Sequence, residues 1–216
     1  MEKLIEAAKA QIKPKMHVSF GGGRTVGRLI KAVKGMDITF SSPSESTRQL
    51  CAELNIPVVP LDQVEKFDVA FDGCDNLDKN LNVLKSNGGI HTFEKLYANL
   101  SDRYIILSPK TRLTDVLNPE VPLCLEVLAD AIPQVLQEVE QLGGKAQVRQ
   151  SSDIAGIVRT SNGFGLIDCN FESYQDISEI NQKLAVMNGV LSTSYFENIV
   201  TDALLSDGDE VVHLTK

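Results

Sequence analysis

The chain has 216 residues, of which 43% are hydrophobic, and its formal net charge at pH 7 is −8. The length allows one sizeable core, or one core with a small second unit. The acidic balance argues against binding to a nucleic-acid backbone, because neutralising phosphates requires a clustered positive surface. A local pocket with two or three cations can still bind a small anion.

Cysteine usage and hydropathy exclude further classes of protein. The four cysteines are far apart and form no CxxC pair, which predicts a reducing compartment, no disulfide framework and no zinc site. No stretch approaches the roughly 20 apolar residues of a membrane span, and the first residues carry interleaved charges instead of an apolar signal segment. We therefore expect a cytoplasmic protein that binds neither membranes nor nucleic acids.

The first half of the chain alternates helical patterns with short apolar runs. The patterns predict helices over 4–12, 25–35 and 44–54, and strands over 16–20, 37–40, 57–61, 67–71 and 104–107. Strands that alternate with helices pair in parallel through right-handed crossovers. The sequence thus predicts an α/β fold with a mostly parallel, Rossmann-like sheet that is covered on both faces.

The order of predicted strands and helices changes after residue 122. The later part predicts strands over 123–128, 146–149, 165–169 and 189–195, helices over 132–142 and 177–187, and a hairpin over 203–214. The order β-α-β-β-α-β is that of a ferredoxin-like module. We expect an α/β catalytic domain made of residues 1–122 and 197–216, and a smaller ferredoxin-like α+β lid or interface domain over residues 123–196.

A glycine-rich segment joins the first predicted strand to the next helix. Gly22 and Gly23 let backbone N–H groups approach an anion at a helix N-terminus. Thr25 adds a hydroxyl donor, and the Arg24 guanidinium can bind a phosphate or a carboxylate. The alternative is a glycine turn that only lets the strand and the helix pack together.

Hydroxyl residues gather at the following strand–helix junction, over residues 41–47. Helix capping explains one serine of this segment, but not the whole cluster. Ligands of α/β sheets bind beyond the carboxyl ends of the strands. Ser41 and Ser42 are therefore candidates for ligand binding, with capping as the alternative.

Two carboxylates, Asp72 and Asp75, follow the predicted strand over 67–71. Mutual repulsion and partial burial can separate the proton affinities of such a pair and suit it to acid–base chemistry. An Asx turn with a helix cap is the alternative, because Asp beside Gly is common in turns.

The segment over 85–95 combines a lysine, paired glycines and a glutamate. Lys85 and the amides of Gly88 and Gly89 can hold an oxyanion, and Glu94 can act as a base. The alternative is a loop followed by a helix N-terminus, where Glu94 favours the helix dipole. His91 is a weaker candidate for the base, because a loop histidine without visible partners is more often a hydrogen-bonding neighbour.

The order of these segments resembles the ribose-5-phosphate isomerase A family, whose pattern is a GTGST loop, an SSxxST segment, DGADE and KGGGAALxxEK. The matching segments here are residues 21–25, 41–47, 72–76 and 85–95. The similarity extends over nearly the whole chain, and the last two segments in this order are its most specific part.

The resemblance implies an aldose–ketose isomerase of the pentose phosphate pathway that needs no metal or nucleotide. Glu94 would be the base that moves a proton between C1 and C2 of ribose 5-phosphate through a cis-enediolate, and Lys85 would stabilise the oxyanion. Asp72 would handle proton transfer at hydroxyls, and Asp75 would position hydroxyls and Lys85. The phosphate would be gripped by the glycine loop, the serines and a cation, either Lys110 or Arg112. The family also implies a homodimer or homotetramer.

Several residues depart from the family pattern, and other functions compete. The departures are Gly22, Arg24, Asn76, Ser86, Asn87 and Pro109, and they leave the exact sugar open. A non-catalytic phosphosugar sensor of the same fold is one alternative, although the roughly 14 residues before the first strand are too few for a helix-turn-helix. A relative of the acyl- or CoA-transferases with a glutamate nucleophile is another.

Overall fold

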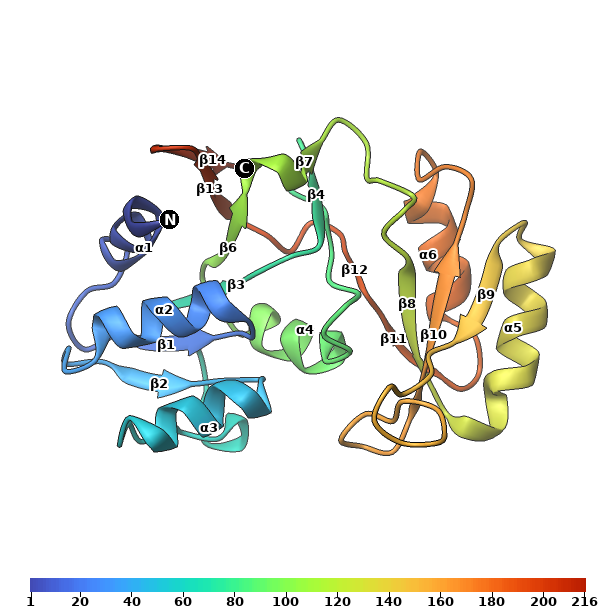
Figure 1. Ribbon diagram of the computed structural model, residues 1–216, viewed down its shortest axis with the longest axis horizontal. Coiled ribbons are helices and arrows are strands. Elements are labelled where there is room, and N and C mark those ends of the chain that lie inside the picture. The colour runs from blue at the N-terminus through green and yellow to red at the C-terminus, as the bar shows by residue number, and fades with distance from the viewer.

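The largest sheet of the protein has six strands. The computed structural model describes residues 1–216 and arranges these strands in the order β14-β13-β6-β3-β1-β2 (Figure 1). Neighbouring strands pair in parallel except β13 and β14, which form the predicted hairpin. The strands are β1 (His17–Phe20), β2 (Thr39–Ser41), β3 (Val69–Asp72), β6 (Tyr104–Pro109), β13 (Asp202–Asp207) and β14 (Glu210–Thr215). The mostly parallel sheet is confirmed.

Helices cover both faces of this sheet because its strands are apolar on both sides. On β3, Val69 and Phe71 belong to the core that includes α1 and α2, whereas Ala70 between them packs in a cluster with Ala98 of α4. Successive residues of a strand point to opposite faces, so each apolar run supplies both cores. The helices of this part are α1 (Glu2–Lys9), α2 (Arg24–Val33), α3 (Glu45–Glu53) and α4 (His91–Asn99).

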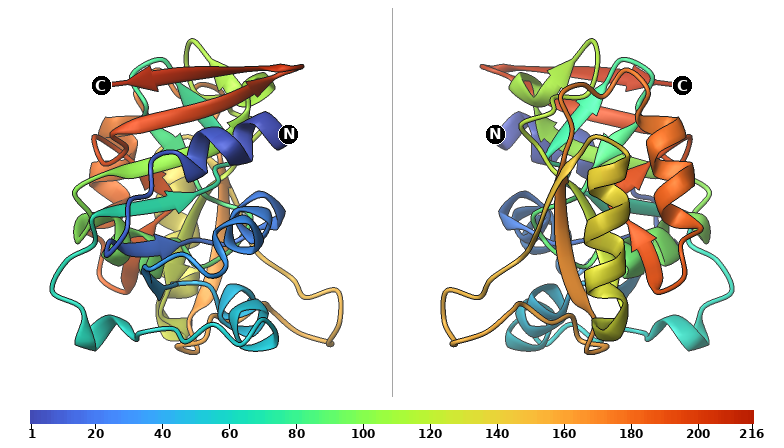
Figure 2. Two further views of the ribbon diagram at one scale, coloured as in Figure 1. Left: turned by 90° about the vertical axis from the view of Figure 1, so that its left-hand side faces the viewer. Right: turned by 90° about the vertical axis from the view of Figure 1, so that its right-hand side faces the viewer.

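The later part of the chain forms a separate antiparallel sheet in the order β11-β8-β10-β9. Its strands are β8 (Leu123–Val127), β9 (Lys145–Val148), β10 (Gly165–Asn170) and β11 (Val190–Thr193). Its helices, α5 (Ile132–Gln141) and α6 (Ile177–Ala185), lie side by side on the outer face (Figure 2, right). The predicted β-α-β-β-α-β order is confirmed.

A third, small sheet was not predicted. It pairs β12 (Tyr195–Phe196), β5 (Val83–Leu84), β4 (Asn76–Asp78) and β7 (Leu113–Thr114) in that order. Strand β12 lies within the second predicted domain but pairs with β5 of the first. The division into two domains stays a prediction.

The predicted strand over 57–61 is wrong. Only one bridge forms there, between Val58 and Phe40, before the 3-10 helix η1 (Leu61–Gln63). Pro57 and Pro60 lack the N–H groups that a sheet ladder needs, so the pairing stops. Two further 3-10 helices are η2 (Lys110–Arg112) and η3 (Ala129–Ala131). None of the helices is both long and apolar enough to cross a bilayer.

Candidate active site

A cavity of about 590 Å³ lies beyond the carboxyl ends of the first parallel strands. Asp72 is the last residue of β3, and Gly22 and Gly23 lie between β1 and α2. The edge is polar because the chain turns into a helix after each of β1 and β2 and leaves amides and hydroxyls there. The cavity is lined by Gly22, Gly23, Ser44, Glu45, Ser46, Gln49, Asp72, Gly73, Cys74, Asp75, Lys85, Gly88, Ile90, Glu94 and Arg112.

Three ionisable side chains meet at the bottom of the cavity. The Lys85 Nζ lies 3.0 Å from Asp72 Oδ1 and 3.2 Å from Glu94 Oε1, and it donates a hydrogen bond to the carbonyl of Gly73. The side chains of Lys85, Asp72 and Glu94 are only 5%, 3% and 7% exposed. Lys85 follows β5, and Glu94 lies in the first turn of α4. The fold thus brings one cation and two carboxylates together in a buried site.

Burial and the neighbouring Asp72 raise the pKa of Glu94 to about 8. Burial is the largest cause, and the Asp72 carboxylate adds to it, while Lys85 acts in the opposite direction. Burial by itself would lower the pKa of Lys85, but Asp72 and Glu94 raise it well above its ordinary value. Lys85 therefore stays charged, while Glu94 can exchange a proton near neutral pH.

Asp75 lines the same cavity but also holds a loop. Its Oδ2 accepts hydrogen bonds from the backbone N–H groups of Ser86 at 2.7 Å and Asn87 at 2.9 Å, and its Oδ1 accepts from Asn87 Nδ2 at 2.7 Å. The Asn87 side chain supplies the third of these bonds. The carboxylate therefore orders the segment that carries Lys85.

The glycine loop packs closely against the cluster of Asp72, Lys85 and Glu94. A Cβ on Gly21 would lie 2.1 Å from Asp72 Cγ, so only glycine allows the carboxylate to approach the backbone there. Gly22 and Gly23 line the cavity, and Gly23 has a φ of 92°. Gly21 therefore allows close packing against Asp72, whereas Gly22 and Gly23 face the cavity.

Six residues of the predicted binding set do not line the cavity. Arg24 and Thr25 lie in the first turn of α2, outside it, and Gly89 faces the antiparallel sheet. The Ser41 hydroxyl donates to the carbonyl of Val59 at 2.7 Å, and the Ser42 hydroxyl accepts from the N–H of Ser44 at 3.1 Å. Lys110 pairs with Asp207 at 2.6 Å.

The ion pair of Lys110 with Asp207 distinguishes Lys110 from Arg112, the two cations between which the resemblance did not decide. Lys110 is about half exposed and already has a carboxylate partner. Arg112 lines the cavity, and its guanidinium donates a hydrogen bond to the carbonyl of Cys74. Of the two cations, only Arg112 therefore lines the cavity.

The sequence analysis named neither Gln49, which lines the cavity, nor Tyr104 behind it, and it weighed Ser46 only as part of the hydroxyl cluster over 41–47. Ser46 and Gln49 point into the cavity from α3, and their i, i+3 spacing on one helix face was a usable signal. The Tyr104 hydroxyl donates to Asp72 Oδ2 at 3.0 Å. No local pattern marks Tyr104, because it lies in an apolar strand and reaches Asp72 only through the pairing of β3 with β6.

His91 is buried away from the cavity. Its Nε2 lies 3.3 Å from the carbonyl of Ser192, and burial, with a smaller contribution from Lys95, lowers its pKa to about 3. A neutral ring outside the cavity is consistent with the reading of His91 as a hydrogen-bonding neighbour. The structure contains no cluster of three or more His, Cys, Asp or Glu side chains that could hold a metal ion.

Comparison with known proteins places the chain in one family. A family model described as ribose 5-phosphate isomerase A (phosphoriboisomerase A) matches residues 39–210. A ribose-5-phosphate isomerase A from a Synechococcus species is 33% identical over 214 residues, which cover 95% of this chain and 90% of the relative. The relative from Pyrococcus furiosus is 30% identical, with 100% and 98% covered.

Solved structures agree with the fold over the full length. The ribose 5-phosphate isomerase A of Methanocaldococcus jannaschii matches with a TM-score of 0.91 and 27% identity, covering 99% of this chain and 97% of that one. These relatives are isomerases, and this chain is an enzyme of that class. It belongs to the ribose-5-phosphate isomerase A family, since the family model spans most of its length.

Proposed function

We propose that this enzyme interconverts ribose 5-phosphate and ribulose 5-phosphate, with Glu94 as the base. The names of its relatives support this substrate. Further support comes from a D-ribose-5-phosphate isomerase solved in complex with phospho-erythronic acid, which matches with a TM-score of 0.91, 28% identity and 100% and 99% of the two chains covered. A phosphorylated aldonic acid has a planar carboxylate that resembles the two oxygens of an enediolate.

The buried Glu94 carboxylate beside Lys85 carries the proposal. A C–H bond next to a carbonyl is only weakly acidic, so its cleavage requires a positioned base and a stabilised oxyanion. Glu94 has a pKa of about 8 because of burial and the nearby Asp72, which suits a base that must both take and return a proton. Lys85 lies 3.2 Å from Glu94 and would balance the charge on the enediolate oxygens.

The remaining cavity residues would place the sugar phosphate. Asp72 would move a hydroxyl proton during ring opening, since its carboxylate lines the cavity beside Lys85. The phosphate would lie toward Gly22, Gly23 and Arg112, which line the cavity and carry the amides and the guanidinium that suit an anion. The amide of Gly88, which also lines the cavity, would face the reacting oxygens.

The test is isomerisation of ribose 5-phosphate by the purified wild type and the Glu94→Gln variant. Loss of a general base lowers kcat by about 10²–10⁴-fold, so we expect a loss in this range with an unchanged fold. Glu126→Gln is the matched control, because Glu126 is a buried carboxylate outside the cavity that accepts from Thr92. Its kcat should stay within about threefold of wild type.

Two outcomes would contradict the proposal. An inactive wild type that still binds ribose 5-phosphate would favour the phosphosugar sensor over the isomerase. Full activity of Glu94→Gln would assign the base to another residue. A cytoplasmic location and a homodimeric or homotetrameric state remain our predictions for this enzyme.

A further inference from the structure

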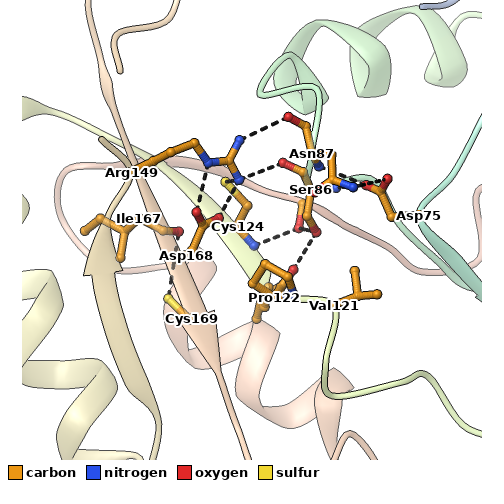
Figure 3. A network of polar contacts seen from close by, with 12 residues as sticks. Asp75, Ser86, Asn87, Val121, Pro122, Cys124, Arg149, Ile167, Asp168 and Cys169 are labelled. Carbon is orange, nitrogen blue, oxygen red and sulfur yellow. Dashed lines mark hydrogen bonds and ion pairs between the residues drawn. The ribbon is translucent and has the colours of Figure 1, made fainter. Parts of the chain in front are cut away.

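The loop that carries Lys85 is held from two sides (Figure 3). On one side, Asp75 accepts the N–H groups of Ser86 and Asn87. On the other side, Arg149 donates from Nη2 to the carbonyl of Ser86 at 2.9 Å and from Nη1 to the carbonyl of Asn87 at 3.2 Å. Ser86 and Asn87 thus each have both the backbone N–H and the backbone C=O hydrogen-bonded to a side chain.

Arg149 itself is oriented by a carboxylate of the antiparallel sheet. It follows β9, and its Nε donates to Asp168 Oδ2 on β10 at 2.8 Å, while Nη2 pairs with Asp168 Oδ1. The two side chains are 19% and 14% exposed. One edge of the planar guanidinium binds the carboxylate, which leaves the other edge for the two carbonyls. The single ammonium of a lysine cannot reproduce this fork.

The neighbouring glycine is pressed against the same sheet. Gly89 has a φ of +64°, and a Cβ at this position would lie 2.7 Å from Leu166 Cδ1 and 3.6 Å from Arg149 Nη1. The turn therefore has a backbone conformation that favours glycine and no room to shift toward β10. Leu166 packs on the turn next to the polar contacts of Arg149.

The held segment lies directly between two groups of the cavity. Lys85 precedes it and contacts Asp72 and Glu94, whereas Gly88 follows it and lines the cavity. A misplacement of about 1 Å can lower the rate about 10²-fold. A shift of the Ser86 and Asn87 peptides would move both groups at once.

We propose that Arg149, oriented by Asp168, is a positioning residue that fixes the loop over 85–89 in its catalytic geometry. This inference rests on the proposed isomerisation, in which Lys85 and the Gly88 amide act on the enediolate. Arg149 does not line the cavity and reaches the loop through the carbonyls of Ser86 and Asn87, while its Nη2 also lies 3.4 Å from Cys124 Sγ. The antiparallel sheet thereby contributes to the chemistry of the parallel one.

The kinetic test compares Arg149→Ala, Arg149→Lys and the Arg149→Ala/Asp168→Asn double variant with wild type. We expect Arg149→Ala to lower kcat about 10- to 100-fold, with KM changed less than about threefold, because the phosphate contacts lie elsewhere. Arg149→Lys should recover only part of this loss, and the Arg149→Ala/Asp168→Asn double variant should lose no more than Arg149→Ala. Arg159→Ala is the control, since the Arg159 guanidinium bonds only to the carbonyl of Gly163.

Amide hydrogen exchange separates this inference from the proposed function. Arg149→Ala should speed exchange in the peptide that contains residues 85–89 and leave β6 unchanged, whether or not wild type isomerises ribose 5-phosphate. If wild type is inactive but Arg149→Ala shows this exchange pattern, the proposed function is refuted while the role of Arg149 in holding the loop is supported. Unchanged amide exchange in Arg149→Ala would overturn the inference. A kcat of Arg149→Ala within about twofold of wild type, or a wild-type kcat in Arg149→Lys, would overturn it as well.

Discussion

Two ionic clusters, one buried and one partly buried, lie on either side of the same loop and differ in their balance of charge. At the edge of the parallel sheet, Lys85 faces the carboxylates of Asp72 and Glu94. At the antiparallel sheet, Arg149 faces one carboxylate, Asp168, and two neutral carbonyls. The first cluster has more carboxylates than cations, whereas the second is balanced.

This difference in charge balance affects the two clusters in different ways. In the first cluster it lets Glu94 exchange a proton near neutral pH, whereas in the second cluster Arg149 keeps its charge. Excess negative charge in a buried site makes the last proton hard to remove, and burial with Asp72 raises the pKa of Glu94 to about 8. Hydrogen bonds to Asp168 help to raise the pKa of Arg149 above its ordinary value, against the effect of burial. Arg149 therefore stays charged near neutral pH, as its proposed positioning role requires.

Removing the cation of the unbalanced cluster should have the largest effect. Lys85→Met leaves two buried carboxylates without a partner, and breaking a buried ion pair in this way costs about 3–5 kcal/mol. Lys85 lowers the pKa of Glu94, so its loss raises that pKa further above the unfolded value. The folded state then binds more protons than the unfolded state, and the free energy of unfolding falls as pH rises. Urea unfolding at pH 6 and pH 9 measures this trend.

The balanced cluster supplies the matched comparison. Arg149→Met removes a partly buried cation from one carboxylate, and we expect a loss of about 1–3 kcal/mol that is similar at pH 6 and pH 9. Equal pH dependence in the two variants would contradict the distinction between the clusters.

The sequence predicted the unbalanced cluster better than the balanced one. Asp72, Lys85 and Glu94 stand in compact motifs, and the rule that ligands bind beyond the carboxyl ends of parallel strands places them together. Arg149 lies about 60 residues further along the chain, and no local pattern connects it with Ser86. Such a contact exists only once the antiparallel sheet has packed on the loop.

Local chemistry also limited the prediction of the fold and of the binding residues. The strands of the small third sheet have two or three residues, which is too short for an alternating pattern. The hydroxyls of Ser41 and Ser42 are taken by nearby backbone groups, a competition that Ser residues commonly show. The sequence gives the number of hydroxyls near a strand end, but not which of them remain free.

The two cations of η2, Lys110 and Arg112, also differ in whether a carboxylate balances their charge. Arg112 lines the cavity without a carboxylate partner, whereas Lys110 is paired with Asp207 on the surface. We expect Arg112→Ala to raise KM for ribose 5-phosphate at least about tenfold, since charge-assisted hydrogen bonds contribute about 1.5–3 kcal/mol. Lys110→Ala should change kcat and KM by less than about twofold, because exposed ion pairs contribute little. Steady-state kinetics of both variants would refute this assignment if Lys110→Ala had the larger KM.

The pH profile tests the unbalanced cluster most directly, although its expected effect is the smallest. The base must be deprotonated, so kcat/KM of wild type should rise about tenfold per pH unit up to a midpoint near the Glu94 pKa of about 8. Asp72→Asn removes the second largest cause of the raised pKa but leaves burial, the largest. Its midpoint should therefore move to lower pH without returning to the ordinary value of 4.5.

Comparison of the two profiles isolates the carboxylate from other titrating groups. The substrate phosphate titrates near pH 6, but it does so equally for both enzymes, so the difference between the profiles belongs to the cluster. Asp72→Asn should also have a lower plateau, because Asp72 is proposed to move a hydroxyl proton. The plateau and the midpoint report different roles of one residue. A lower plateau at an unchanged midpoint would keep Asp72 in proton transfer but remove it as a cause of the raised Glu94 pKa, and burial alone would then set the pH dependence.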